Sequence, residues 1–360
     1  MSFKEELLNF KNQFDSKLSI FLDTKINETK KYNPVIEQNL KHIAYITQAG
    51  GKRFRPAMAY FGYSLISQKT NENIWLLCLA LELFHVFALI HDDIIDKSLV
   101  RRGVPTVEAI YLDYFKIDFP SLDHKHFAAS AAILSGDFVL VLANQLVISL
   151  NQKENTNTFE TQQLFEQMQI ELVAGQEDDC FGVGLADLDD LNVDRIKAML
   201  IAKSGNYSIQ KPLLMGAILA GADQVQLDIL ASSGEKLGLV FQIKDDILGI
   251  FGSEADIGKS NTSDIKEGKK TLLVAKTYQT LTDIEKAKFK TILGNEIASI
   301  SEISWFKEII LKSGAVSQLE EYCLELVTEA KEELNSLESV DKQALQFLLD
   351  LADYLYNRKS

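Results

Sequence analysis

The 360-residue chain lacks several features that would identify other kinds of protein. Neither glycine-rich phosphate loop, GxxxxGK[ST] or GxGxxG, is present, which excludes the common nucleotide-binding loops. Only five prolines occur, so long stretches are free to be helical. The three cysteines lie far apart without a CxxC pair and are predicted to be buried free thiols: Cys78, Cys180 and Cys323. This cysteine usage excludes a disulfide framework and indicates a reducing, cytoplasmic location.

A long uninterrupted apolar run is also absent. The most apolar stretch, 74–90, is broken by Glu82 and His85, so we expect a buried helix and no transmembrane segment. The first residues are charged and lack the apolar core of a signal peptide. The net charge is −14, which disfavours binding of nucleic acid or an anionic membrane over the whole surface. Any basic site must therefore be local.

Apolar residues recur at the helical spacing i, i+3, i+4 and i+7, as in Leu81, Phe84 and Ala88. Alternating strand patterns and Asn-Gly or Asp-Gly hairpin turns are absent. The pattern predicts an all-α fold of about a dozen helices. The predicted breaks lie near 26–33, 50–55, 67–73, 97–104, 116–124, 153–157, 186–190, 252–270 and 335–340. No low-complexity linker divides the chain, so we expect a single domain over residues 1–360.

Two apolar segments, 87–97 and 241–251, each contain a pair of aspartates within the shared frame I-x-D-D-I-(I/L). Carboxylates at the ends of buried helices are unfavourable unless a cation lies between them. The two pairs therefore indicate a cation site. The alternative is that each pair is a solvated helix end.

The first pair belongs to a denser group of charges, DDIIDKSLVRRGVPT. Asp92 and Asp96 are four residues apart, so a helix places them on one face, whereas Asp93 points away and suits a supporting role. Hard carboxylate oxygens suit Mg²⁺ bound together with a substrate phosphate. The arginines that follow, Arg101 and Arg102, indicate a phosphate between metal and guanidinium. A plain salt-bridge network is the alternative.

Upstream, the segment GGKRFRP at 50–56 places a flexible turn before three basic residues and a proline that starts a helix. Such a turn suits anion binding, and a solvated helix start is the alternative. His85 lies two helical turns before Asp92. It is either a core histidine or a ligand at the acidic site.

Six motifs in this order resemble those of the trans-isoprenyl diphosphate synthases: GGKRFRP, LIHDDIIDKSLVRRGVPT, GQEDD, AKSGNYSIQKPLLMGAILAG, LVFQIKDDILGIFG and GKSNTSDIKEGKKTLL. The resemblance implies an all-α bundle (the isoprenoid synthase fold) whose aspartate-rich helices face each other across a central cavity, and a homodimer. It implies 1′–4 condensation of isopentenyl diphosphate with an allylic diphosphate, which is dimethylallyl, geranyl or farnesyl diphosphate. The implied cofactor is Mg²⁺, with three ions in each active site.

The resemblance also implies a role for each matching residue. Isopentenyl diphosphate is expected to bind Lys52, Arg55, His85 and Arg102. The remaining substrate-binding residues, which serve mainly the allylic diphosphate, are Arg101, Lys203, Ser204, Gln242, Lys259 and Lys269. Mg²⁺ is expected to bind Asp92, Asp96, Asp245 and Asp246. The residues expected to stabilise the leaving diphosphate, and so to be catalytic, are Asp92, Asp96, Arg101, Lys203 and Asp245.

The chain departs from the family pattern most clearly in its second acid motif. Gly249 stands where a third aspartate is usual, and the sequence leaves open whether Asp264 or Glu267 replaces that acid. The usual Lys-Thr pair reads Lys203-Ser204, which keeps the hydroxyl group.

Two other classes of protein share parts of this pattern. A type I terpene cyclase has the same implied fold but needs a second motif of the form (N/D)Dxx(S/T)xxxE. Counted from Asp245, this chain has Gly249 and Ser253 at the Ser/Thr and Glu positions, so that motif is absent. A regulatory subunit of a heteromeric synthase should have lost one whole acid cluster, whereas here the first is complete and the second keeps two acids.

Product length is expected to depend on the helix before Asp92, along which the growing chain lies by resemblance. At about 1.5 Å per residue, Phe87 and Phe84 lie about 7.5 and 12 Å before Asp92, and Ala88 leaves room between them. One of the two rings is expected to be plain core packing. An aromatic residue five positions before the first aspartate, without an insertion in DDxxD, resembles the short-chain C20 synthases. The expected product is therefore geranylgeranyl diphosphate, with farnesyl diphosphate as the alternative.

Overall fold

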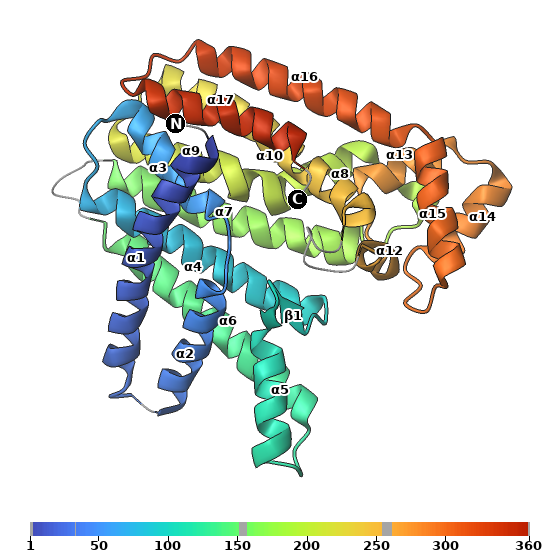
Figure 1. Cartoon of the computed structure of the whole chain (residues 1–360), viewed down its shortest axis with the longest axis horizontal. Helices are drawn as coiled ribbons and strands as arrows, with labels where there is room; N and C mark the ends of the chain where they lie inside the picture. Colours follow the sequence, from blue (N-terminus) through green and yellow to red (C-terminus); the bar gives the residue numbers. More distant parts are fainter. Residues whose placement is uncertain (1–2, 33, 151–156, 254–260, 359–360) are drawn as a thin grey trace. The chain divides into compact units, whose positions relative to one another are not determined.

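The computed structural model describes residues 3–32, 34–150, 157–253 and 261–358 (Figure 1). The chain forms two compact units. The first unit comprises residues 1–60 and 69–158, and the second unit comprises residues 61–68 and 159–360. The expectation of a single domain over the whole chain stays a prediction.

The first unit is helical apart from one short hairpin. Its elements are α1 (Phe3–Thr29), α2 (Pro34–Gln48), α4 (Glu72–Ile95), β1 (Val100–Arg101), β2 (Val104–Pro105), α5 (Val107–Asp118) and α6 (His124–Ile148). Helix α3 (Phe54–Ile66) begins in the first unit and ends in the second. Within the first unit α6 packs against both α4 and α5, and α1 packs against α2 (Figure 1).

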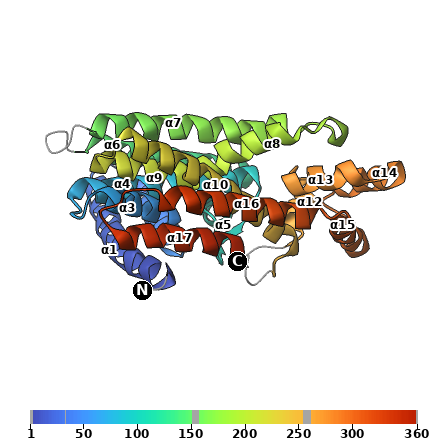
Figure 2. The ribbon, with the colours of Figure 1, turned by 90° about the horizontal axis from the view of Figure 1, so that it is seen from above.

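The second unit is built around the long helix α10. Its elements are α7 (Thr158–Glu177), the π-helix η1 (Asp178–Gly182), the 3₁₀-helix η2 (Leu188–Asp190), α8 (Val193–Leu200), the π-helix η3 (Ile201–Gln210), α9 (Lys211–Ala220), α10 (Gln224–Phe251), α12 (Ser263–Glu267), α13 (Leu272–Thr280), α14 (Asp283–Ile292), α15 (Ile300–Lys312), α16 (Ala315–Asn335) and α17 (Lys342–Asn357). Helix α10 packs against η3, α16 and α17, and Figure 2 shows α16 and α17 beside it.

Helices α4 and α6 form the core of the first unit because both are apolar around most of their circumference. Leu77 and Phe84 of α4 and Val139 of α6 are buried. By length and composition alone both helices are able to cross a membrane. The apolar stretch is 67% buried in α4 and 44% buried in α6, and core helices of soluble proteins pass the same test. The expected absence of a transmembrane segment stays a prediction.

Two glycines let η3 and α10 approach closely. A Cβ atom added to Gly238 of α10 would lie 2.7 Å from the carbonyl oxygen of Gly205 in η3. A side chain at Gly238 would collide with η3, and one at Gly205 would be tightly packed, because its Cβ would lie 3.1 Å from the Gly238 backbone. The contact brings η3, which carries Lys203, against the helix that carries Asp245.

The all-α prediction is confirmed, and the expected breaks coincide with interruptions between helices wherever the structure describes them; most of 153–157 and part of 252–270 lie outside the described residues. Four further turns, at 221–223, 281–282, 293–299 and 313–314, were not predicted because each is short and the helical period resumes at once. One short hairpin, β1–β2, was not predicted. These strands pair only two residues each, too few for an alternating pattern to be visible.

The cysteines are free in the part of the chain that the structure describes, as predicted. Cys78 and Cys323 are buried, and burial raises the pKa of the Cys323 thiol to about 12. The prediction of burial is wrong for Cys180, which is half-buried. It lies in the π-helix η1, where Gln176 Nε2 donates to its Sγ atom over 3.5 Å.

Candidate active site

The first aspartate cluster lies at the C-terminal end of α4. The helix begins after Asn71, whose side chain accepts a hydrogen bond from the amide of Ile74, and Asp96 is its C-cap. The Asp92 side chain is 30% exposed and therefore accessible, whereas Asp93 is buried. Carboxylates at a helix C-terminus face the negative end of the helix dipole. The cluster is therefore electrostatically unfavourable unless cations are close to it.

Arg101 supplies part of that positive charge. Its Nε donates to Asp93 Oδ1 over 2.6 Å, and its Nη2 donates to Asp92 Oδ2 over 3.2 Å. The hairpin β1–β2 returns the chain to α4, with Arg102 and Gly103 at left-handed φ angles of 54° and 78°. Burial raises the pKa of Asp93 to about 6, and the Arg101 guanidinium opposes that rise. Asp93 therefore holds Arg101 beside Asp92.

A separate group of cations in the first unit surrounds His85. Arg102 Nη1 donates to the carbonyl oxygen of Gly50 over 2.7 Å, and Arg102 Nη2 lies 3.4 Å from His85 Nε2. Gly51 has a φ of 117°, and a Cβ added there would lie 2.9 Å from Arg102 Nη1. The double glycine thus provides both a turn that other residues disfavour and room for a guanidinium.

The electrostatics of this group suit an anion. Burial holds the pKa of His85 well below its usual value, and the charges of Arg55 and Arg102 lower it further. Burial also lowers the pKa of Arg102, and the nearby charges of Arg53, Arg101 and Arg55 act in the same direction. Guanidiniums gathered around a neutral histidine are stabilised by a bound carboxylate or phosphate. The structure therefore places His85 within an arginine cluster.

The three basic residues after the double glycine serve different purposes. Arg53 is buried and pairs with Glu82 and with Asp15, whose Oδ1 lies 2.8 Å from the arginine Nε. Arg53, which the sequence analysis did not assign to a substrate, thus ties α1 and α4 to the turn. Lys52 is exposed and Arg55 is half-buried, so both stay candidates for anion binding.

The residues proposed to set product length differ in their exposure. Phe84 is fully buried, as expected for plain core packing, and its ring lies 5.5 Å from that of Phe87. Phe87 and Ala88 are half-buried, and the Phe87 ring is 4.7 Å from that of His91. Of the two phenylalanines, Phe87 is therefore the better candidate for contact with a ligand.

In the second unit Asp245 pairs with a residue that the sequence analysis missed. Arg358, at the end of α17, forms a salt bridge with Asp245, and its Cζ lies 4.8 Å above the ring of Phe241. Its side chain is only 9% exposed. Arg358 belongs to no motif that would mark it as a site residue in the sequence, because only the packing of α17 on α10 brings it to the aspartate.

Asp246 is the buried member of this second pair. Its Oδ1 accepts a hydrogen bond from Gln242 Nε2 over 2.8 Å, and its Oδ2 has no hydrogen-bond partner among the described residues. Burial raises the pKa of Asp246 to about 8, and the charges of Asp264 and Asp245 add to the rise. A buried carboxylate oxygen without a donor is unfavourable by itself and suits a bound cation.

Lys203 lies in the ten-residue π-helix η3, an uncommon conformation that is frequent at functional sites. Its ammonium group pairs with Asp179 of η1, which fits the family turn noted in the sequence as GQEDD. Gly175 allows this approach, because a Cβ there would lie 2.6 Å from the Lys203 amide nitrogen. The neighbouring hydroxyl residue, Ser204, is half-buried.

The cations predicted near 252–270 are described only in part. Lys269 pairs with Glu267 over 3.1 Å and with Asp264 over 3.3 Å. Lys259 lies outside the described residues.

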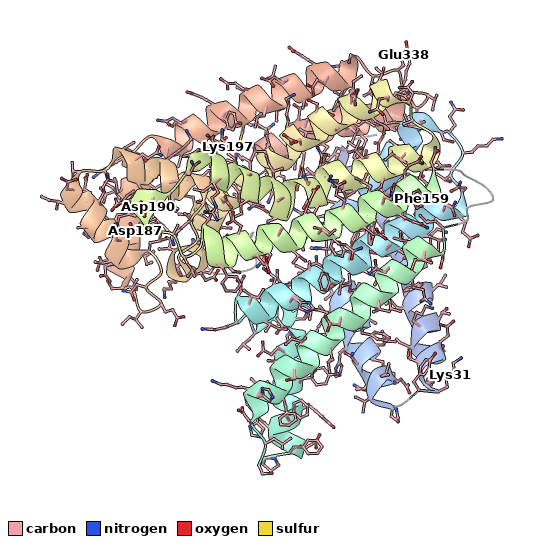
Figure 3. The ribbon with its side chains drawn as sticks, turned by 180° about the vertical axis from the view of Figure 1, so that it is seen from behind. Lys31, Phe159, Asp187, Asp190, Lys197 and Glu338 are labelled. Atoms are coloured by element: carbon pink, nitrogen blue, oxygen red, sulfur yellow. The ribbon has the colours of Figure 1, made fainter. Side chains whose placement is uncertain are left out.

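Another group of acids in the second unit, 187–190, has a structural role. Lys290 Nζ lies 2.7 Å from Asp187 Oδ1 and 2.6 Å from Asp189 Oδ2, and Tyr278 donates a hydrogen bond to Asp189. Figure 3 shows Asp187 and Asp190 together at one end of this unit. These salt bridges fix the loop after η1 and leave the acids of α10 as the candidate site of the second unit.

The aspartates of the two pairs suit Mg²⁺ that is also bound by substrate phosphates. In the described ranges no group of three or more His, Cys, Asp or Glu side chains is arranged to hold a metal ion. Magnesium in phosphate enzymes keeps several waters and is bound by one or two carboxylates plus substrate phosphates. Asp92 and Asp96 at one helix end, and Asp246 with its unpaired oxygen, supply carboxylates of that kind.

Comparisons with known proteins agree on one family. The sequence model described as polyprenyl synthetase matches residues 37–310. The chain is 30% identical to a geranylgeranyl diphosphate synthase of Sulfolobus acidocaldarius, over 85% of this chain and 87% of the relative. It is 32% identical to a farnesyl diphosphate synthase of Geobacillus stearothermophilus, over 72% and 80% of the two chains. A geranylgeranyl pyrophosphate synthase from Corynebacterium glutamicum, solved with isoprenyl diphosphate and magnesium, has a TM-score of 0.90 and 28% identity, over 97% and 98% of the chains.

Proposed function

Because the chain belongs to the polyprenyl synthetase family, we propose that it is a trans-isoprenyl diphosphate synthase that makes geranylgeranyl diphosphate. The main support for the proposal is the presence of two groups of charged residues in the first unit. The first unit contains an accessible aspartate cluster and, separately, an arginine cluster around His85. An enzyme that joins two diphosphate substrates needs two anion sites. One site activates the diphosphate that leaves, and the other only binds the diphosphate of the second substrate.

Asp92 and Asp96 are proposed to hold Mg²⁺ against the allylic diphosphate, with Arg101 fixed beside them by Asp93. Breaking the allylic C–O bond leaves a diphosphate of high negative charge. Bound Mg²⁺ would neutralise part of that charge. Arg101 and Lys203 add positive charge that is already in place, so little reorganisation accompanies the reaction. Asp245, Asp246 and Gln242 of the second unit are also proposed to bind Mg²⁺ and diphosphate.

Lys52, Arg55, His85 and Arg102 are proposed to bind isopentenyl diphosphate. The neutral His85 donates one N–H to a phosphate oxygen, and the guanidiniums balance its charge. The allylic C–O bond breaks, the new C–C bond forms between C1 of the allylic group and C4 of isopentenyl diphosphate, and the tertiary cation at C3 then loses a proton from C2. The released diphosphate is proposed to take that proton, since it is the strongest base next to the reacting carbons.

The C20 product is supported by Phe87, whose half-buried ring stands about 7.5 Å along α4 from Asp92. It is also supported by the relatives named as geranylgeranyl diphosphate synthases. Farnesyl diphosphate is the second candidate, because the relative from G. stearothermophilus carries that name.

A homodimer is proposed as the working assembly. Helix α6 exposes the apolar side chains Ile133, Leu134, Val141 and Ile148, which are each more than 40% exposed. Several exposed apolar side chains on one helix suit a surface that another molecule covers, and two-fold dimers are the commonest solution. We also propose three Mg²⁺ ions in each active site and a cytoplasmic location. Sedimentation of the wild type and of Leu134→Asp tests the dimer, which the substitution should dissociate.

Incubation of the full-length protein with isopentenyl and dimethylallyl diphosphates and Mg²⁺, followed by product analysis, tests the function. The proposal expects prenyl diphosphates extended to C20. A cyclic hydrocarbon would identify a terpene cyclase, and absence of turnover would identify a regulatory subunit; either result overturns the proposal. A product that stops at C15 would replace geranylgeranyl diphosphate by farnesyl diphosphate.

A further inference from the structure

The ring of His91 is held at the contact between α4 and α6, within the first unit. His91 belongs to α4, and its ring fills space that a side chain at position 136 of α6 would need. A Cβ atom added to Gly136 would lie 2.2 Å from His91 Cε1 and 2.4 Å from His91 Nδ1. Real Cβ atoms do not approach other atoms so closely. The imidazole ring and a side chain at residue 136 therefore exclude each other.

Backbone conformation does not account for Gly136. It lies inside the regular helix α6 and is not among the glycines with positive φ. In a helix interior glycine is less favourable than alanine, because glycine loses more conformational freedom when the chain folds. Space for the His91 ring is the physical reason for this glycine that the structure provides.

Both nitrogen atoms of the His91 ring face oxygen atoms. Nδ1 lies 3.2 Å from the carbonyl oxygen of Phe87, one helical turn earlier, and Nε2 lies 3.4 Å from Oδ1 of Asp137 on α6. A ring turned over by 180° would place carbon atoms against both oxygens. The two oxygens therefore favour one orientation of the ring, and Gly136 allows it to lie close to α6.

The ring of Phe87 lies between two other rings along α4. The His91 ring, one turn later, is 4.7 Å from it, and the fully buried Phe84 ring, one turn earlier, is 5.5 Å from it. A phenylalanine side chain in a helix has two common χ1 rotamers, so a ring without neighbours can turn aside. Contact with His91 on one side and Phe84 on the other restricts such a turn.

We propose that His91 is a positioning residue for product length. Gly136 and Asp137 of α6 hold the His91 ring, and that ring keeps Phe87 from turning out of the path of the growing prenyl chain. The proposal rests on the proposed function, in which Phe87 limits the chain. It adds that the position of the Phe87 ring, and with it the product length, depends on side chains of α6.

Product analysis of the full-length protein with dimethylallyl diphosphate, Mg²⁺ and excess isopentenyl diphosphate tests this proposal. His91→Ala removes the ring that restrains Phe87, so the fraction of products longer than the main wild-type product should rise about fivefold. Asp137→Ala leaves the ring but not its preferred orientation, and should raise the same fraction about twofold. His126→Ala is the matched control and should keep the wild-type products, because His126 is exposed on α6 and its ring also lies beside a phenylalanine, Phe127.

A double variant separates positioning from general damage to α4. In the Phe87→Ala background the ring that His91 restrains is absent, so adding His91→Ala should change the product distribution no further. A structural role of His91 that does not act through Phe87 would instead give the same shift in both backgrounds.

Gly136→Ala tests the geometry without changing α4. Its methyl group should lower the free energy of unfolding while His91 is present, and should not lower it in His91→Ala, where the space is empty. Urea denaturation measures both values, and circular dichroism establishes that each variant is folded. If His91→Ala does not fold, the products of Gly136→Ala and Asp137→Ala decide the question, since both disturb the same ring.

Wild-type products from folded His91→Ala would overturn the proposal, and so would an equal shift from His91→Ala in the wild-type and Phe87→Ala backgrounds. A Phe87→Ala variant that keeps the wild-type product length would overturn it as well. Failure of the proposed function is distinguishable, because it shows as absence of prenyl diphosphate products from the wild-type protein.

Discussion

The two aspartate clusters contain similar residues but are assembled in different ways. In the first unit, Asp92, Asp93 and Asp96 come from one helix end, and their arginine follows within nine residues. In the second unit, α10 contributes Asp245 and Asp246, and Arg358, which pairs with Asp245, comes from 113 residues away. A cluster made from consecutive residues is fixed as soon as its helix forms. A cluster made from distant residues depends on the packing of the whole unit, so substitutions in its neighbours should affect it more.

The largest effect is expected from the first cluster. Asp92→Asn or Asp96→Asn should lower kcat on the order of a thousandfold, because the charge on the leaving diphosphate loses its main stabilisation. Steady-state kinetics at saturating Mg²⁺ measures this. Asp113→Asn is the control, since that side chain is 77% exposed and forms only a surface pair with Lys116. If either variant turns over about as fast as the control, Asp92 and Asp96 do not bind the catalytic Mg²⁺.

Smaller effects are expected on KM, and substitutions of cations in the two units should each affect a different substrate. Lys52→Ala or Arg55→Ala should raise KM for isopentenyl diphosphate by about tenfold to a hundredfold, and Lys203→Ala should do the same for the allylic substrate. Each variant loses a charged hydrogen bond to only one of the two diphosphate substrates. Initial rates with each substrate varied in turn give both KM values. Similar changes of both values in all three variants would mean that the two anion sites are assigned incorrectly.

Substitutions of Phe84 and Phe87 should have different effects, the first on stability and the second on product length. Phe84 is fully buried, so Phe84→Ala should lower the free energy of unfolding by about 3–5 kcal/mol. Phe87→Ala should lengthen the main product by at least one C5 unit, because the half-buried ring no longer limits the prenyl chain. Urea denaturation and mass spectrometry of the products measure the two effects. If neither variant nor the double variant changes product length, neither ring sets it.

The smallest effect concerns pH. The folded protein keeps His85 neutral because burial and nearby arginines hold its pKa well below 6.5, whereas the unfolded chain takes up a proton near pH 6.5. The stability that this neutral histidine contributes is therefore lost as the pH falls below about 6.5. Relative to His85→Gln, the wild type should lose about 2 kcal/mol of unfolding free energy between pH 7.5 and pH 5. Urea denaturation at both pH values measures this.

The exposed His126→Gln substitution is the control for the pH experiment. A difference between wild type and His85→Gln that stays constant from pH 7.5 to pH 5 would show that His85 is not held neutral.

Features set by nearby residues were predictable from the sequence, and features set by packing were not. The helical period predicted the all-α fold and those of its breaks that the structure describes, and the spacing of Asp92 and Asp96 predicted that one helix carries both. The same reasoning missed the structural role of Arg53, because its partner Glu82 lies 29 residues away. It left open whether Asp264 or Glu267 replaces the missing acid at Gly249, because both precede Lys269, and only the packing of α12 against α10 shows that Asp264 lies beside Gly249.

The central claim is that the protein has two separate anion sites, one served by aspartates and the other by arginines around His85. A crystal structure with Mg²⁺, isopentenyl diphosphate and an unreactive allylic diphosphate analogue tests it most directly. We expect metal ions on Asp92 and Asp96 with the allylic diphosphate, and the isopentenyl diphosphate on Arg55, His85 and Arg102. An empty arginine cluster, or metal ions bound away from both aspartate clusters, would contradict this account.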